Sequence, residues 1–235
     1  MRSRSDLKVV LVVPASNTTM EAELRGYWPE VAEIYRVGVP RPARPMVAQE
    51  LPEYRANTLR MVAPLSARKP DIVLYGCTTA GFLAGPDGDD EVCAALADAA
   101  GAPAVTAAGS MVKALRHSGV QRPAIVTPYL DASNESLKRF LAAMDIRVAA
   151  LESFRLARIE DYDQVALAQV RDLALATARS ADADGVFVAC TQLRTLGILD
   201  ELRQALEKPA WGAIQATVWA GRRALGLDDA THRNM

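Results

Sequence analysis

Short apolar segments alternate with longer amphipathic segments along most of the chain. Segments rich in Val, Ile and Ala predict eight strands, at 8–14, 31–37, 71–76, 102–106, 123–127, 146–151, 184–189 and 209–213. Helical periodicity marks the segments between them, at 51–68, 89–101, 133–145 and 162–182. Strands that are apolar on both faces are typical of sheets covered by helices on both sides. The alternation predicts an α/β fold built on mostly parallel sheets.

The two halves of the sequence resemble each other. The segments "PDIVLYGCT" and "ADGVFVACT" align with Cys77 on Cys190, and each follows an earlier strand that ends in a Pro-containing turn. A repeat of this kind predicts two similar units. We therefore expect two pseudosymmetric lobes with an active site in the cleft between them. The first lobe is expected to span 1–112 together with a C-terminal helix at 215–235, and the second to span 113–214.

The composition is that of an ordinary globular protein, with 50% hydrophobic residues, 23% charged residues and a formal net charge of -1. Basic residues are dispersed and matched by acids, which argues against a nucleic-acid-binding surface. The apolar run at 9–14 is too short for a signal sequence or a membrane span, so a cytoplasmic protein without membrane association is expected. A homo-oligomer is also expected, because exposed helices of such lobes commonly pair.

Three cysteines, Cys77, Cys93 and Cys190, occur in a chain large enough to fold without disulfides, so reduced thiols are expected. Cys77 and Cys190 each follow a predicted strand and precede a threonine and a predicted helix start. Ligands of open α/β sheets collect at this end of the strands. A single cysteine there is more often a small buried apolar residue. Two at equivalent positions of a repeat favour chemistry, whereas Cys93 lies within a helical segment and is expected in the core.

Two thiols that face one cleft would suit proton transfer or addition across a small planar centre. Forming a thiolate at pH 7 costs roughly 2 kcal/mol, which a helix N-terminus or neighbouring hydroxyl and amide donors could offset. His117 and His232 lie at a predicted helix end and in the tail, which argues against a Cys-His hydrolase. No Cys or His pair has metal-ligand spacing, and the glycines of the predicted polar turn at 85–90 do not fit a nucleotide motif. No metal or cofactor is expected.

Other side chains are predicted to face the same cleft. Asn17 follows the first strand, where it could cap a helix or bind a carboxylate. Tyr129 occupies the equivalent turn of the second half and could bind a second carboxylate or serve in packing. Arg41 and Arg44 lie in a Pro-rich segment, where a guanidinium would suit an acidic substrate but a solvated loop is the commoner explanation. Whether the loop 38–45 closes over the site is left open.

Several motifs together resemble the Asp/Glu racemase superfamily, in the branch of maleate cis-trans isomerases and arylmalonate decarboxylases. They are "VVPASNTTME", "YGCTTAGFLAG", "TPYLDASNE", "ACTQLRTL" and "IQATVWAGRRALG", and the likeness covers nearly the whole chain. The resemblance implies two pseudosymmetric α/β lobes with the site between them. Decarboxylases of this branch keep a cysteine only at the second motif and have glycine at the first. The presence of both Cys77 and Cys190 favours isomerase or racemase chemistry.

By this resemblance, Cys77 would add as a thiolate to the double bond of maleate. Cys190 would supply and later remove a proton at the neighbouring carbon, and rotation about the temporary single bond would yield fumarate. The resemblance also implies a set of residues that hold the two carboxylates of a small carboxylate substrate: Asn17, Thr78, Thr79, Tyr129, Thr191 and Gln192.

Maleate isomerases carry a further substrate-binding asparagine after the sixth strand, and residues 151–163 contain none. Ser153 or Arg155 could substitute for it, or the substrate could be a different acid. Three alternatives therefore stay open. They are a two-cysteine racemase or epimerase of an amino or hydroxy acid, an arylmalonate decarboxylase-like enzyme, and a noncatalytic small-acid sensor.

Overall fold

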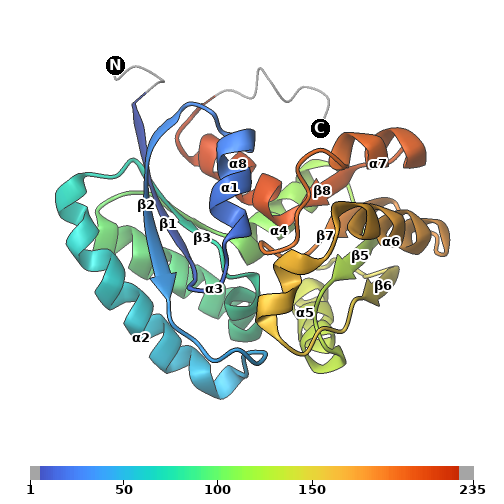
Figure 1. Ribbon diagram of the computed structural model, residues 1–235, viewed down its shortest axis with the longest axis horizontal. Helices are drawn as coiled ribbons and strands as arrows, with labels where there is room; N and C mark the ends of the chain where they lie inside the picture. Colours follow the sequence, from blue (N-terminus) through green and yellow to red (C-terminus); the bar gives the residue numbers. More distant parts are fainter. Residues whose placement is uncertain (1–5, 228–235) are drawn as a thin grey trace.

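Two parallel four-stranded sheets organise the computed structural model, which describes residues 6–227. The first sheet has the order β2-β1-β3-β4 and the second the order β6-β5-β7-β8, so each strand has a counterpart in the same place of the other sheet (Figure 1). The strands are β1 Leu7–Pro14, β2 Val31–Val39, β3 Ile72–Tyr75, β4 Ala104–Thr106, β5 Pro123–Thr127, β6 Ala150–Ser153, β7 Gly185–Val188 and β8 Ala210–Gly212. Strands are present at or next to all eight predicted positions, although the sixth, expected at 146–151, begins only at Ala150. The predicted pair of pseudosymmetric α/β lobes is confirmed.

Helices follow most of the strands and cover the sheets. They are α1 Thr19–Tyr27, α2 Leu51–Val62, α3 Thr78–Ala100, α4 Ala107–His117, α5 Asp131–Ala143, α6 Leu167–Arg179, α7 Leu199–Leu206 and α8 Ala213–Ala224. Three short 3₁₀ segments complete the order: η1 Ala48–Glu50, η2 Ala63–Arg68 and η3 Ile159–Gln164. None of these helices within residues 6–227 combines the length and the hydropathy that crossing a membrane requires.

The inner strands are the most buried, although the edge strand β8 is fully buried as well. The inner strands β3, β5 and β7 are buried at every residue, and so are the last six residues of β1. The edge strand β2 contains exposed residues. Strands covered on both faces need apolar side chains on both faces, which explains why the inner strands are the continuous apolar runs of the sequence.

The two lobes share a hydrophobic core, and the first lobe has a second core of its own. A single cluster of buried apolar side chains includes residues of β1, β5 and α8. Helix α8 packs against α1 and α4 and against β3 and β4, and so lies where the lobes join (Figure 1). The helix ends at Ala224, short of the predicted 215–235, and residues 228–235 lie outside the described part. The predicted boundary between 112 and 113 falls inside α4, and the lobe boundaries stay a prediction.

Two local predictions were wrong. The predicted turn at 85–90 belongs to α3, which is interrupted only by a kink where Gly85 has φ 75° before Pro86. Glycine accepts this backbone conformation, and proline is tolerated in the first turn of the next helical segment. The helix expected directly after Cys190 is also absent, because residues 191–198 are irregular and α7 begins at Leu199.

Candidate active site

The turns after β1, β3, β5 and β7 surround one small pocket of about 310 Å³, a volume that includes the part open to solvent. All eight residues predicted for the site line it: Asn17, Cys77, Thr78, Thr79, Tyr129, Cys190, Thr191 and Gln192. Parallel strands place their carboxyl ends at the same edge of a sheet, and the two lobes turn these edges toward each other. Residues more than a hundred positions apart thus meet in one place.

Cys77 lies at the start of α3, as its N-cap residue, and is 3% exposed. The unpaired N–H groups in the first turn of a helix favour negative charge nearby, as a thiolate would carry. Gly76, before it, packs so closely that a Cβ there would lie 2.2 Å from the Sδ of Met20. Thr78, after it, has a buried hydroxyl without a hydrogen-bond partner in the described part of the chain. The turn therefore presents a thiol and a free hydroxyl side by side in sequence.

Cys190 has a different environment. Burial raises the pKa of its thiol to about 11, although the Gln192 amide and the Tyr129 hydroxyl act in the opposite direction. The Gln192 N–H donates to the Cys190 Sγ at 3.3 Å. At neutral pH Cys190 is therefore a protonated thiol, which suits a proton donor.

The two cysteine turns contact each other directly. Thr191, next to Cys190, donates its hydroxyl to the carbonyl of Gly76, next to Cys77, at 2.7 Å. The Asn17 amide donates to the Oγ1 and the carbonyl of Thr191 at 3.1 and 3.3 Å. The Asn17 Oδ1 accepts from two backbone N–H groups at the start of α1, both at 3.1 Å. Asn17 thus caps a helix and joins the lobes, whereas its contact with substrate stays a prediction.

Tyr129 packs edge-on against two other rings, with centroid distances of 5.7 Å to Phe82 and 6.0 Å to Tyr162. Burial raises the pKa of Tyr129 well above its ordinary value, and the neighbouring Cys190 thiol adds to the rise, while the Thr79 hydroxyl opposes it. The phenol therefore stays protonated and can donate a hydrogen bond within the pocket.

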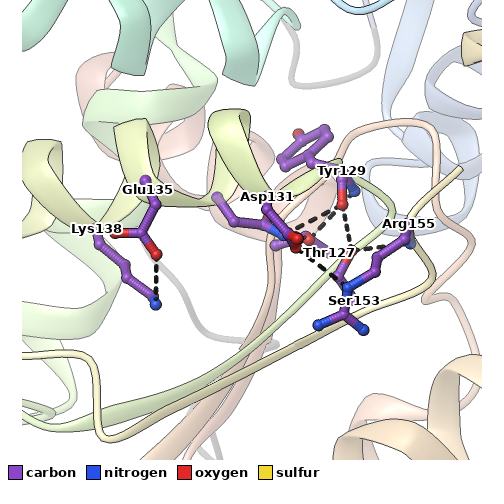
Figure 2. Close-up of polar contacts among 8 residues, drawn as sticks. Thr127, Tyr129, Asp131, Glu135, Lys138, Ser153 and Arg155 are labelled. Atoms are coloured by element: carbon purple, nitrogen blue, oxygen red, sulfur yellow. Dashed lines mark hydrogen bonds and ion pairs between the residues drawn. The ribbon is translucent and has the colours of Figure 1, made fainter. Parts of the chain in front are cut away.

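The backbone around Tyr129 is fixed by the last residue of β6 and by the segment that follows it. Ser153 donates its hydroxyl to the Tyr129 carbonyl, and the Arg155 Nε donates to the Asp131 carboxylate at 3.1 Å (Figure 2). The Tyr129 ring points away from this network (Figure 2). Neither Ser153 nor Arg155 is among the residues that line the pocket. The idea that one of them replaces the family asparagine is therefore not supported.

The Pro-rich loop after β2 reaches across to the second lobe. The carbonyl of Ala43 accepts a hydrogen bond of 2.9 Å from the backbone N–H of Ile159. Arg41 of this loop lines the pocket, and its Nε is buried without a hydrogen-bond partner among residues 6–227. The loop 38–45 therefore borders the site through Arg41.

Comparison with known proteins agrees with this geometry. Residues 41–234 match the arylmalonate decarboxylase family. The chain belongs to the arylmalonate decarboxylase family. Arylmalonate decarboxylase from Bordetella bronchiseptica is 29% identical over 63% of this chain, and the match spans 62% of that protein. The maleate isomerase of Geobacillus stearothermophilus is 25% identical, with 94% of this chain and 92% of that protein covered.

A solved structure shows the same fold. It is that of a cysteine-to-serine variant of the Nocardia farcinica maleate cis-trans isomerase, with a covalently bound succinylcysteine intermediate. The TM-score is 0.82 at 24% identity, and 94% of this chain and 93% of that one are covered. The predicted superfamily branch and the prediction of an enzyme of the isomerase class are confirmed by the comparisons.

Five residues that line the pocket were not among the predicted site residues: Pro14, Arg41, Gly76, Ile159 and Tyr162. Arg41 was considered for an acidic substrate, but a solvated loop is the commoner explanation for a Pro-rich segment. Tyr162 carries no signal, since it lies in a segment of helical periodicity. Within residues 6–227, no group of three or more His, Cys, Asp or Glu side chains is suited to hold a metal ion. The expectation of a reaction without metal or cofactor stays a prediction.

Proposed function

We propose that the protein is a cofactor-independent cis-trans isomerase of a small unsaturated dicarboxylate, with conversion of maleate to fumarate as the reference reaction. The observation that carries the proposal is the pairing of two unlike thiols in one pocket. Both thiols are buried, Cys77 at a helix N-terminus and Cys190 where burial raises the pKa of its thiol to about 11. The names of the maleate isomerase relatives support the same reaction.

The proposed reaction begins when the Cys77 thiolate adds to one alkene carbon of maleate, forming a carbon–sulfur bond. The electron pair of the double bond moves to the neighbouring carbon, which takes the proton of the Cys190 thiol. The product is a succinyl group attached to Cys77, in which a single bond permits rotation. The Cys190 thiolate then removes a proton from the same carbon, and the double bond re-forms as the carbon–sulfur bond breaks. Fumarate leaves, and both cysteines return to their starting states.

The remaining pocket residues divide into donors to substrate and supports of the turns. The hydroxyls of Thr78, Thr79 and Tyr129 are proposed to bind a substrate carboxylate and to stabilise the negative charge that develops on it during addition. Asn17, Thr191 and Gln192 are proposed to contribute to the same site. The Gln192 side chain also donates to the Ile159 carbonyl at 2.9 Å, and Asn17 and Thr191 join the lobes.

The test is to incubate the purified protein with maleate and to follow fumarate by proton NMR. Cys77→Ala and Cys190→Ala should each lower kcat by about a thousandfold or more, because each removes a group needed in the transition state. Cys93→Ala is the matched control, because Cys93 lies outside the pocket, with its thiol directed to the Ala104 carbonyl. Turnover that survives either pocket substitution would refute the assignment.

Decarboxylation of an arylmalonate is the second candidate, because the chain belongs to that family and Cys190 is the cysteine that decarboxylases of the branch are expected to share. Release of carbon dioxide from phenylmalonate, lost in Cys190→Ala but kept in Cys77→Ala, would favour it. Solvent deuterium exchange into amino or hydroxy acids would instead indicate a racemase. The cytoplasmic location and the homo-oligomer remain part of the proposal.

A further inference from the structure

Two buried polar atoms that belong to pocket-lining residues have no hydrogen-bond partner in the described part of the chain. They are the Oγ1 of Thr78 and the Nε of Arg41. Buried polar groups are almost always paired, and each unpaired one costs roughly 1 to 3 kcal/mol. Both atoms can donate a hydrogen bond. A ligand rich in acceptor oxygens would satisfy both.

We propose that Arg41 binds one carboxylate of the substrate and thereby restricts the site to dicarboxylates. The proposal deepens the proposed function and rests on it for the identity of the reacting bond. In this arrangement the hydroxyls of Thr79 and Tyr129, beside Cys190, serve the other carboxylate. An arginine in this position was not among the predicted substrate-binding residues.

Charge supports this role for Arg41. Among the described residues that line the pocket, it is the one Lys, Arg or His. A dianion that leaves water for a buried pocket loses hydration, and a cation that also donates hydrogen bonds offsets that loss. The planar guanidinium can bind a carboxylate through two parallel N–H groups, which fixes orientation as well as charge.

The loop leaves Arg41 available for a ligand. Its neighbour Arg44 binds the Glu50 carboxylate with both guanidinium branches, at 2.6 and 3.2 Å. Arg41 forms no ion pair with any residue of 6–227 and donates only from Nη2, to the Arg44 carbonyl at 3.3 Å. The Glu50 carboxylate is therefore paired with Arg44, and the Arg41 Nε is left to donate to a ligand in the pocket.

The backbone on both sides of Arg41 is restrained. Pro40 and Pro42 flank it, and proline fixes φ near -65°. One residue further on, Ala43 is joined to Ile159 of the second lobe. A restrained backbone loses little conformational entropy when a ligand binds, so the guanidinium is preorganised for a carboxylate.

The test measures binding without turnover, by calorimetric titration with succinate, a saturated dicarboxylate, and butyrate, a monocarboxylate of similar length. Arg41→Gln should weaken succinate binding by about 10- to 100-fold and change butyrate binding by less than about threefold. Arg41→Lys should restore part of the loss, because the charge returns without the planar fork. Arg60→Gln is the matched control, an exposed arginine of α2 that does not line the pocket.

Unchanged succinate affinity in a folded Arg41→Gln protein would overturn the role of Arg41. So would an unaltered protein that fails to bind succinate, or binds it no more tightly than butyrate. Arg41-dependent succinate binding without conversion of maleate would keep the inference and refute the isomerase. Conversion of maleate by Arg41→Gln with an unchanged KM would support the isomerase and refute the role of Arg41.

Discussion

At the scale of single residues, burial keeps Cys190 protonated. Cys190 is 5% exposed, and loss of hydration is the largest cause of its raised pKa. The Tyr129 hydroxyl and the Gln192 N–H stabilise the thiolate and so partly offset that loss. A thiol with these donors can release its proton to a carbanion and take it back, because the anion that forms is already hydrogen-bonded.

Asp89 is a buried carboxylic acid outside the pocket. Its titration makes the free energy of unfolding depend on pH. Its Oδ2 accepts from the Thr106 hydroxyl, whereas its Oδ1 has no partner among the described residues. Burial raises the pKa of Asp89 from 3.8 to about 6. Between these values the folded state holds a proton that the unfolded state has lost, so the free energy of unfolding falls as pH rises.

We expect the contribution of Asp89 to be full below about pH 4 and to decline by about 2 to 3 kcal/mol by pH 7. Asp89→Asn removes the titration, so the difference in unfolding free energy between this variant and the unaltered protein should change by that amount over the range. Urea unfolding at several pH values measures it. Asp87→Asn, an acid of the same helix that is not fully buried, should show no such change. Parallel pH profiles of the unaltered protein and Asp89→Asn would contradict the assignment.

The sequence indicated where the two thiols lie but not the surroundings of each thiol. Cys77 and Cys190 could be placed at one edge because a strand, a turn and the repeat are local patterns. Burial raises the pKa of Cys190, and the hydroxyl of Tyr129, which is distant in sequence, acts in the opposite direction. The position of Arg41 beside the pocket depends likewise on a hydrogen bond between Ala43 and Ile159. Contacts between distant segments leave no periodic signal.

At the scale of elements, the loop after Cys190 is held by a helix of the other lobe. The carboxylate of Glu23, on α1, accepts from the N–H groups of Thr195 and Leu196 at 2.7 and 3.0 Å. It also accepts from the Thr195 hydroxyl at 3.1 Å. These bonds satisfy donors that the expected helix after Cys190 would have used internally, which accounts for the irregular path of 191–198. No pattern within "ACTQLRTLGIL" could have revealed a partner on α1.

Glu23→Gln should destabilise the fold by about 1 to 3 kcal/mol, because two hydrogen bonds from N–H groups to a carboxylate oxygen become weaker bonds to a neutral amide oxygen. The variant should also lower kcat for maleate, because the loop positions Cys190 and Gln192. Thermal or urea unfolding and steady-state kinetics measure the two effects. Glu21→Gln, on the same helix but partly exposed, should leave both nearly unchanged. Equal behaviour of the two variants would exclude a positioning role for Glu23.

At the scale of the whole molecule, the lobes are joined by a shared core and by hydrogen bonds beneath the pocket. The buried cluster that includes β1, β5 and α8 is continuous, and Trp28 and Trp211 both belong to it. The sequence repeat predicted two lobes but not the buried cluster that they share, because that cluster depends on how α8 packs between them. The lobes should therefore not unfold separately.

We expect a single cooperative transition on unfolding in urea. Far-UV circular dichroism reports on the helices of both lobes. Variants that keep only Trp28 or only Trp211, with the other two of the three tryptophans replaced by Phe, report on each residue alone. All three signals should give the same midpoint, since neither lobe can expose its part of the core alone. A transition of Trp211 at lower urea than that of Trp28 would show that the lobes are independent.

The two lobes repeat one strand order but differ in the segment after the cysteine, with a helix directly after Cys77 and an irregular loop after Cys190. Duplication of a half-sized ancestor would have supplied a matched couple of sulfurs. Divergence of one connection has left Cys77 at a helix N-terminus, whereas the Gln192 N–H of an irregular loop donates to the Cys190 Sγ. With Cys77 as the nucleophile and Cys190 as the proton donor, we expect the thiolate to add to one face of a planar substrate only. Any stereocentre formed on the way is therefore expected to have a single handedness.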